Sequence, residues 1–488
     1  MPYSSKNSTP HSIKPLKYLS FKFPGFGRKY LSAISILAIF SLCYISSFPA
    51  VILHPWHIDA VSTAARNELD TNISHILFGI SGSAKTWRRR RHYSDLWWRR
   101  NCTRGFVWLD EAPQGAPEKW PETSPPYKIS GDTARFKYTC WYGSRSAVRI
   151  ARIVKESFDL GLGDVRWFVM GDDDTVFFTH NLVSVLRKYD HRQMYYIGGI
   201  SESVEQDVVH SYTMGYGGGG FAFSRPLAAA LVRILDRCID RYAAFYGSDQ
   251  KIGACISEIG VPLTKEVGFH QMDIRGNPFG LLSAHPLAPL VSLHHLDYLQ
   301  PLFRDTNRVA SIKKLMTPYE FDPSRLLQHS FCYDLTRNWS ISISWGYNLQ
   351  LYPFILSAQD LSTPLQTFLT WSWRKGPFTF NTRLMSLNPC ERPLEFRFHG
   401  IDEVEGGFTS TSYTRDQSEF RRKCDKLNYK AAYLLKAFNV TAGLLHPQYW
   451  NKAPSRECCQ IMSGSPREND VVGVKIRGCN QWESISIP

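Results

Sequence analysis

The sequence has no internal repeat, no long low-complexity tract and no paired Cys-x-x-Cys or Cys/His spacing. The first two absences leave no sign of a repeat array or a biased segment. The third makes zinc binding an unfavoured role for the six cysteines found after residue 309. A chain of 488 residues, 43% hydrophobic and 14% aromatic, is long enough to bury two ordinary cores. A disordered polyampholyte and a lone small module are therefore excluded.

Most of the chain also lacks net charge, although the formal total is +14. Residues 1–30 carry +6 and residues 85–104 carry +7, which leaves +1 for all the rest. A chain that is basic throughout would point to nucleic acid or to an anionic membrane. Here the basicity belongs to two short segments, and each needs its own explanation.

The first basic segment precedes an apolar run. Residues 31–53 contain no formal charge, and at the helical rise they are long enough to cross a hydrocarbon core. Because the basic flank is N-terminal, the positive-inside bias places residues 1–30 in the cytosol. We therefore expect a cytosolic tail, a type II transmembrane signal anchor at 31–53 and a stem at 54–73. A cleaved signal peptide is the competing interpretation, but its apolar stretch is normally shorter.

Cysteines and glycosylation sequons agree with an oxidising, luminal compartment beyond the predicted span. Ten cysteines lie there, an even number compatible with disulfides, although their pairing cannot be read from the sequence. Asn-x-Ser/Thr sequons are glycan acceptors in secreted proteins. They occur beyond the span at Asn72, Asn101, Asn338 and Asn439.

The second basic segment, residues 85–104, interleaves arginines with Trp87, Trp97 and Trp98. Such interleaving could stack nucleic-acid bases, but a luminal protein does not meet nucleic acid. Two interpretations remain: a face that receives an acidic glycan or an anionic membrane surface, and a packing helix with solvated arginines. We favour the packing helix and expect no nucleic-acid partner.

Residues 74–308 alternate between strand-like and helix-like stretches, which indicates an α/β domain. Strands are expected at 75–82, 105–111 and 165–175. A helix is expected at 146–161, where apolar residues recur at near-helical spacing.

From residue 309 to 488 the character changes. Aromatic, alternating stretches predict an antiparallel, β-rich C-terminal region. Six cysteines fall within it, and we expect them to be disulfide staples. They are Cys332, Cys390, Cys424, Cys458, Cys459 and Cys479.

Three consecutive carboxylates, Asp172, Asp173 and Asp174, follow the apolar strand-like run 167–170. They repel one another and lose hydration, which is tolerated when a cation or hydrogen-bond donors neutralise them. A solvated acidic turn is the ordinary alternative. The position after a buried strand favours a hard divalent ion such as Mn²⁺ or Mg²⁺.

Three further stretches could carry chemistry, and each has an ordinary structural explanation. Gly217–Gly220 removes every Cβ from four residues, which permits close approach of a ligand but also describes a flexible loop. Asp249 opens a helix-like run and could be a helix cap. His294 and His295 end a short strand-like stretch and could be surface imidazoles.

Together and in this order, these stretches resemble the Fringe-type β-1,3-glycosyltransferases, and more closely their plant relatives that carry an added C-terminal region. The matching stretches are RWFVMGDDDTVFF, GYGGGGFAFSRPLA, GSDQKIGACISEIGVPLT and the His-bearing strand. The resemblance covers roughly residues 74–300. It implies a GT-A nucleotide-sugar-binding fold, held in the Golgi membrane by a single-pass type II anchor with the catalytic domain in the lumen.

Carried over by position, the resemblance implies a metal site and a catalytic base. Asp172 and Asp174 correspond to the outer carboxylates of the family's Asp-x-Asp motif, with Asp174 a direct Mn²⁺ ligand. His294 corresponds to the metal-binding histidine, and a one-residue shift to His295 stays open. Asp249 corresponds to the catalytic base.

The resemblance also implies a donor-binding set. The tetraglycine replaces a Gly-Gly-Ala-Gly stretch that lines the donor sugar pocket, and the departure at Gly219 leaves the choice of donor open. Three residues after the first two strands resemble uridine contacts, and an arginine aligns with a lysine near the donor. The implied set is Ser81, Gly82, Asp110, Arg149, Asp172, Asp173, Gly218, Gly219 and Gly220.

The implied activity is an inverting, metal-dependent transfer of a sugar from a UDP-sugar to a hydroxyl of a glycan or glycoconjugate acceptor, forming a β-1,3 linkage. The metal would neutralise the diphosphate leaving group, and the base would take the proton of the acceptor. Two alternatives stay open: a catalytically silent luminal carbohydrate-binding or scaffold protein of the same fold, and a metal-dependent phosphohydrolase. The sequence does not indicate an oligomeric state.

Overall fold

The computed structural model describes residues 70–113, 120–416, 424–462 and 470–486. The predicted tail and anchor, and the predicted stem up to residue 69, lie outside these described residues. In the part that is described, no helix is both long and apolar enough to cross a membrane. The described residues all fall within one compact unit by their internal contacts.

A seven-stranded sheet lies at the centre of the N-terminal half, in the order β3-β2-β1-β4-β7-β6-β8. The first four of these strands are parallel, β7 is antiparallel to both of its neighbours, and β8 is parallel to β6. The expected α/β fold is confirmed. The strands are β1 (Ile76–Ser81), β2 (Arg104–Leu109), β3 (Tyr127–Ile129), β4 (Trp167–Asp172), β6 (Tyr196–Gly198), β7 (Phe221–Ser224) and β8 (Leu263–Lys265).

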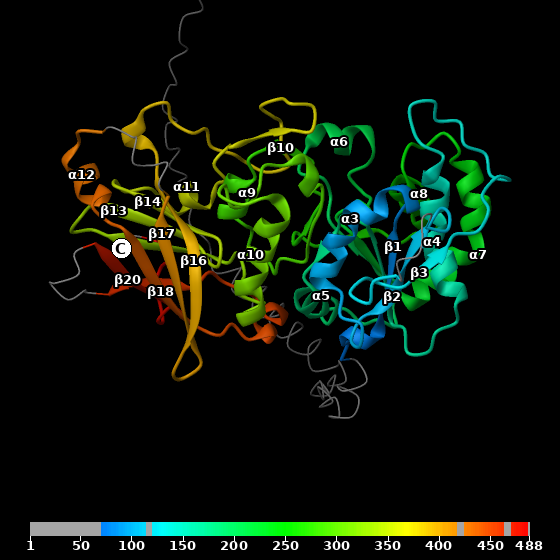
Figure 1. Ribbon diagram of the computed structural model, residues 1–488, viewed down its shortest axis with the longest axis horizontal. Helices are drawn as coiled ribbons and strands as arrows, with labels where there is room; N and C mark the ends of the chain where they lie inside the picture. Colours follow the sequence, from blue (N-terminus) through cyan, green and yellow to red (C-terminus); the bar gives the residue numbers. More distant parts are fainter. Residues whose placement is uncertain (1–69, 114–119, 417–423, 463–469, 487–488) are drawn as a thin grey trace, which may run out of the picture. The chain divides into compact units, whose positions relative to one another are not determined.

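Helices cover both faces of this sheet, which is why β1 is buried along its whole length. Figure 1 shows α4, α7 and α8 on one side of the sheet and α3 and α5 on the other. A disulfide, Cys238–Cys255, joins α7 to α8. The helices are α3 (Ala84–Trp97), α4 (Ser146–Asp159), α5 (Thr179–Leu186), α6 (Val204–Val209), α7 (Arg225–Arg241) and α8 (Ser248–Ile259).

Helix α3 is formed by the second basic segment. Trp87 and Trp97 are buried in the core, and the indole N–H of Trp97 donates to the carbonyl of Thr175 at 3.1 Å. The prediction of a packing helix is therefore confirmed. The prediction that its arginines are solvated is wrong for Arg90, which forms ion pairs with buried carboxylates.

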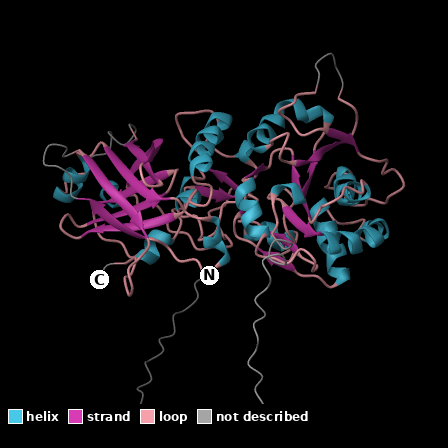
Figure 2. Ribbon diagram, turned by 90° about the horizontal axis from the view of Figure 1, so that it is seen from below, coloured by secondary structure: helices cyan, strands magenta, loops and turns pink. Residues whose placement is uncertain are grey.

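The C-terminal half contains an eight-stranded sheet in the order β12-β13-β14-β16-β17-β18-β20-β19. All of its pairings are antiparallel except β18 with β20. This sheet is the broad group of strands in Figure 2. The strands are β12 (His329–Asp334), β13 (Trp339–Ser344), β14 (Asn348–Tyr352), β16 (Leu394–Val404), β17 (Phe408–Arg415), β18 (Ala437–Gly443), β19 (Cys458–Met462) and β20 (Val471–Arg477).

All six cysteines of the C-terminal region form disulfides with one another, as expected for staples. The pairs are Cys332–Cys459, Cys390–Cys424 and Cys458–Cys479. Cys102 and Cys140 are free thiols.

Two small sheets complete the fold around the site. One joins β5 (Val176–Phe177), β11 (Ser292–Leu293) and β9 (Phe269–His270). The other pairs β10 (Ile274–Gly276) with β15 (Phe368–Thr370) and so links the two halves of the chain. The remaining helices are α9 (Phe279–Ser283), α10 (Arg308–Phe321), α11 (Ala358–Ser362), α12 (Leu427–Tyr433) and the 3₁₀ turns Ile73–His75, Leu296–Tyr298, Pro389–Glu391 and Pro447–Asn451.

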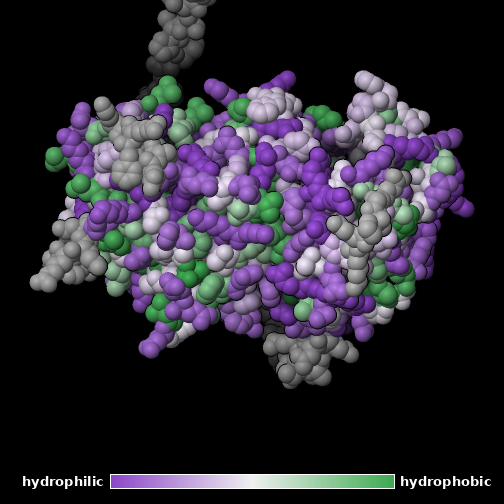
Figure 3. Space-filling model, in the orientation of Figure 1, coloured by the Kyte–Doolittle hydropathy of each residue, from purple (hydrophilic) through white to green (hydrophobic). Residues whose placement is uncertain are grey.

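Apolar side chains are concentrated inside this arrangement. One cluster of buried residues runs from β1 and α3 through β11 into the C-terminal sheet, and a second lies between the central sheet and α4, α7 and α8. The face drawn in Figure 3 is accordingly mostly hydrophilic, with hydrophobic side chains scattered between. The residues discussed next lie where β1, β2 and β4 end, which is the ligand-binding edge of open α/β sheets.

Candidate active site

The acidic turn begins at the last residue of β4. Asp172 ends the strand, and Asp173 and Asp174 form the turn that leads to β5. Thr175 fixes its shape, because the backbone N–H of Asp172 donates to the Thr175 hydroxyl at 2.8 Å. The same hydroxyl donates to the carbonyl of Gly218 at 2.7 Å. The turn is therefore held against the tetraglycine.

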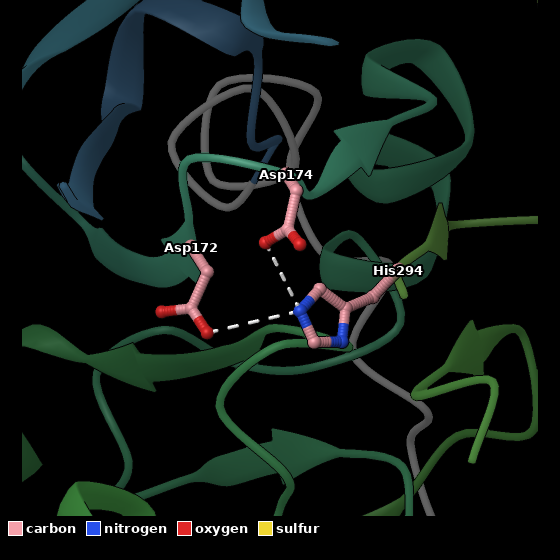
Figure 4. A group of neighbouring side chains, drawn as sticks. All are labelled: Asp172, Asp174 and His294. Atoms are coloured by element: carbon pink, nitrogen blue, oxygen red, sulfur yellow. Dashed lines mark hydrogen bonds and ion pairs between the residues drawn. The ribbon is translucent and has the colours of Figure 1, made fainter. Parts of the chain in front are cut away.

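Asp172, Asp174 and His294 converge on one point (Figure 4). Nε2 of His294 lies 3.1 Å from a carboxylate oxygen of Asp174 and 3.8 Å from one of Asp172. One ligand atom from each residue lies within 4.8 Å of the others. Two carboxylates and an imidazole are a donor set that suits a divalent cation such as Mn²⁺.

The orientation of His294 fits a metal ligand. Its Nδ1 lies 3.3 Å from the carbonyl oxygen of Gln271, and because a carbonyl only accepts, Nδ1 carries a proton. Nε2 therefore faces the carboxylates, the arrangement in which an outer hydrogen bond fixes the ring of a ligating histidine. Without a metal, burial disfavours the imidazolium, but Asp174 and Asp172 outweigh it and raise the pKa of His294 to about 9.

His295 has a different environment. Its Nδ1 lies 3.0 Å from a carboxylate oxygen of Asp273, and its ring stacks on Trp371 with centroids 4.5 Å apart. His295 adopts a left-handed backbone conformation with φ of 54°, which turns the chain sharply after β11. The structure thus places His294, and not His295, with the two aspartates.

Arg90 was not singled out by sequence reasoning. Its guanidinium lies 3.0 Å from Asp173 and 3.3 Å from Asp174. Burial and the neighbouring Asp174 raise the pKa of Asp173 to about 7, against the opposing effect of Arg90. Beside it, the Tyr93 hydroxyl donates to Asp297 at 2.6 Å. Arg90 and Tyr93 are three residues apart on α3 and so share one face of the helix. This spacing is the sequence signal that could have singled out Arg90.

The tetraglycine contacts both His294 and Asp249. The N–H of Gly217 donates to the Asp249 carboxylate at 3.1 Å. Gly218 lies so close to His294 that a Cβ on it would be 2.0 Å from the ring. The N–H of Gly219 donates to the Gln271 side chain at 2.6 Å, and Gly220 has a positive φ of 84°. The close approach to His294 explains why residue 218 is a glycine, and the positive φ explains why residue 220 is a glycine.

Asp249 lies in the first turn of α8, and Gly247 occupies the cap position. Its second carboxylate oxygen accepts the N–H of Gln250 at 2.8 Å. Burial raises the pKa of Asp249, while the two backbone hydrogen bonds lower it. A half-buried carboxylate held by backbone donors can act as a proton acceptor.

The remaining predicted donor residues cluster at the ends of β1 and β2, but their polar atoms are engaged within the protein. The Ser81 hydroxyl donates to Asp172. Asp110 accepts from the Ser83 hydroxyl and the Ala84 N–H, both at 2.8 Å. Arg149 donates to the carbonyls of Trp108 and Gly82, both at 2.9 Å. The structure thus brings the predicted donor set to one edge of the sheet, adjacent to Asp172.

Two curated proteins are similar to parts of this chain. The β-1,3-glucosyltransferase of Homo sapiens is 33% identical over 109 residues, which are 22% of this chain and 20% of that protein. The β-1,3-glucosyltransferase of Mus musculus is 32% identical over 142 residues, 28% of this chain and 27% of that protein. The matched part thus spans about a quarter or less of these relatives.

A solved structure, the mannosyltransferase PcManGT from Pyrobaculum calidifontis in complex with GDP-Man and Mn²⁺, is similar over 40% of this chain and 55% of that one. Its TM-score is 0.25 and its identity 14%. The model of the family described as "Protein of unknown function, DUF604" matches residues 206–459, just over half of the chain, including the tetraglycine, Asp249 and His294. The chain therefore belongs to the DUF604 family.

Proposed function

We propose that this chain is a metal-dependent, inverting glycosyltransferase that transfers a sugar from a UDP-sugar to a hydroxyl of a glycan or glycoconjugate, forming a β-1,3 linkage. The observation that carries the proposal is the path through Gly217 and Gly218. One of these consecutive residues donates to Asp249 and the next packs on His294. The proposed proton acceptor and one ligand of the proposed cation site thus contact consecutive residues of one short backbone segment.

The residues have separate tasks in this reaction. A cation held by Asp172, Asp174 and His294 would supply neutralisation of the diphosphate leaving group. Arg90 balances the charge of Asp173 and Asp174. Asp249 takes the proton of the acceptor hydroxyl as that oxygen attacks the anomeric carbon. A single displacement of this kind inverts the anomeric centre. The partial similarity to β-1,3-glucosyltransferases supports the same reaction class.

We also propose the Golgi lumen as the location, with residues 31–53 as a type II anchor. All four sequon asparagines beyond the predicted span are exposed, as glycan attachment requires. The paired cysteines are what an oxidising compartment favours.

The deciding experiment measures UDP release by the full-length protein from UDP-glucose, UDP-galactose and UDP-N-acetylglucosamine, with Mn²⁺ or with EDTA. We expect Mn²⁺-dependent turnover of at least one donor, lost in Asp249→Asn. An exposed residue of the C-terminal segment provides the control, and Trp482→Ala should keep the activity. A fully active Asp249→Asn would contradict the assignment of the base.

The same experiment separates the alternatives. A catalytically silent carbohydrate-binding protein would release no UDP from any donor. A simple phosphate ester, added to the set of substrates, detects a phosphohydrolase, which would release phosphate from it. Such enzymes usually gather more His and Asp ligands, whereas one three-residue group comes together within the described residues.

A further inference from the structure

Exposed aromatic rings form a ladder beside the N-terminus of α8. Tyr142 and Tyr246 stack with ring centroids 5.6 Å apart and planes within 12°. The half-buried ring of His210 lies against Tyr246 with centroids 5.3 Å apart and is tilted by 30° from it. Tyr142 is 58% exposed and Tyr246 41% exposed. We call Tyr142, Tyr246 and His210 the aromatic ladder.

The ladder is connected to the proposed base by two routes. Gln250, the neighbour of Asp249, accepts the N–H of Tyr246 at 3.0 Å and donates to the carbonyl of His210 at 3.2 Å. At the inner end, His210 makes an edge contact with Tyr216, which directly precedes Gly217 in the chain. Gly217 in turn donates to Asp249. The rings and the carboxylate are therefore positioned by the same residues.

Contacts within the protein hold the ladder in place. The Tyr138 hydroxyl donates to the carbonyl of Tyr246 at 3.0 Å. A Cβ at Gly143 would lie 1.9 Å from the Tyr138 hydroxyl oxygen and 3.1 Å from the Tyr246 ring, so Gly143 packs closely against both tyrosines. Rings that are already ordered lose little entropy when a ligand is placed on them.

The loops that carry the ladder are free of formal charge. Residues 139–144, 210–216 and 242–248 contain no Asp, Glu, Lys or Arg, in a chain of which 20% is charged. Aromatic rings carried by loops without formal charge complement a neutral sugar, whose C–H face packs on an aromatic ring.

We propose that the aromatic ladder is the acceptor subsite, and that it receives a neutral pyranose unit of a glycan lying flat on the ring of Tyr142, which Tyr246 supports from behind. This inference rests on the proposed function. In the reaction, the acceptor hydroxyl proton passes to Asp249, a new C–O bond forms at the anomeric carbon, and the bond to UDP breaks, with UDP leaving with the electron pair. The acceptor is thus a carbohydrate and not a polypeptide side chain.

The test measures acceptor kinetics of the full-length protein with Mn²⁺ and the UDP-sugar that turns over. The acceptors are the methyl β-glycosides of glucose, galactose and N-acetylglucosamine. Tyr142→Ala and Tyr246→Ala should raise the acceptor KM about tenfold or more. Tyr142→Phe, which keeps the ring, should restore the KM to within about twofold. Trp482→Ala, at a side chain 94% exposed elsewhere, is the control for removing a surface aromatic.

Donor hydrolysis without acceptor, measured on each variant, reports on the donor half of the site separately. An acceptor KM unchanged in both alanine variants would overturn the inference and assign the rings to docking of another macromolecule or a membrane. If the wild type turns over no donor, the proposed function fails. Binding of the same glycosides, followed by saturation-transfer NMR, then decides: signals lost in Tyr142→Ala support a sugar subsite, and no binding by the wild type overturns it.

Discussion

The backbone of Gly218 is in contact with the imidazole of His294, and a methyl group on Gly218 would lie 2.0 Å from Cε1 of that ring. Because this is far inside van der Waals contact, Gly218→Ala must move His294 away from Asp172 and Asp174. We expect the Mn²⁺ concentration for half-maximal activity to rise about 10- to 100-fold, the usual effect of disturbing a ligand's support. Metal titrations of UDP release measure this directly.

A matched glycine shows whether the effect is specific. Gly163 has no atom within 4 Å of where its Cβ would lie, so Gly163→Ala should leave the Mn²⁺ requirement unchanged. An unchanged requirement in Gly218→Ala would mean that His294 is not a ligand.

His294 should lose its proton at alkaline pH, and the metal-free protein should then become less stable. Its pKa in the folded protein is about 9, above the ordinary value of 6.5. The charged imidazole therefore contributes stability that is fully present below pH 6.5 and is lost as the pH rises through 9. Between pH 7 and 9 we expect the free energy of unfolding in EDTA to fall by on the order of 2 kcal/mol. Urea denaturation at several pH values measures it.

The stabilisation of the protein by Mn²⁺ should have the opposite pH dependence. Mn²⁺ binding at Nε2 of His294 displaces a proton and therefore becomes tighter as the pH rises. The stabilisation by Mn²⁺ should therefore grow between pH 7 and 9. His294→Asn should remove both trends, and their persistence in that variant would assign them to another group.

Removing Arg90 should destabilise the protein, because buried Asp173 would lose its ion pair and buried Asp174 would keep only that with His294. We expect Arg90→Ala to lower the free energy of unfolding by about 3 kcal/mol in EDTA. Mn²⁺ should recover part of the loss, since it neutralises the same carboxylates. Arg89→Ala, one residue away and exposed, is the control. Equal unfolding curves for the two variants would show that the ion pairs of Arg90 contribute nothing.

The sequence predicts the α/β sheet well because β1, β2 and β4 are short apolar runs ending in turns, a local signal. It does not predict Arg90, because the contact with Asp173 spans 83 residues and depends on how α3 docks on the sheet. The sequence also does not predict whether His294 or His295 faces the aspartates. Adjacent residues point in different directions, and only the pairing of β11 and the left-handed turn at His295 decides which faces the aspartates.

The pairing of the cysteines also depends on contacts between residues far apart in the sequence. Cys458 and Cys459 are neighbours on β19, and successive side chains of a strand point to opposite faces. They accordingly bond to different partners, Cys479 and Cys332. The count of cysteines predicts that staples exist, but the pairing requires the sheet order, which no local pattern contains.

The proposed luminal location can be tested through the four sequons, because oligosaccharyltransfer occurs on the luminal side and requires an accessible asparagine. Asn72, Asn101, Asn338 and Asn439 are all exposed. We expect the protein made in a eukaryotic secretory pathway to lose mass on treatment with an N-glycosidase. Single Asn→Gln variants should each remove one glycan-sized step, while Asn428→Gln, an asparagine outside any sequon, should not. A chain whose mass does not change on N-glycosidase treatment would place this body on the cytosolic side and remove the support for a type II anchor.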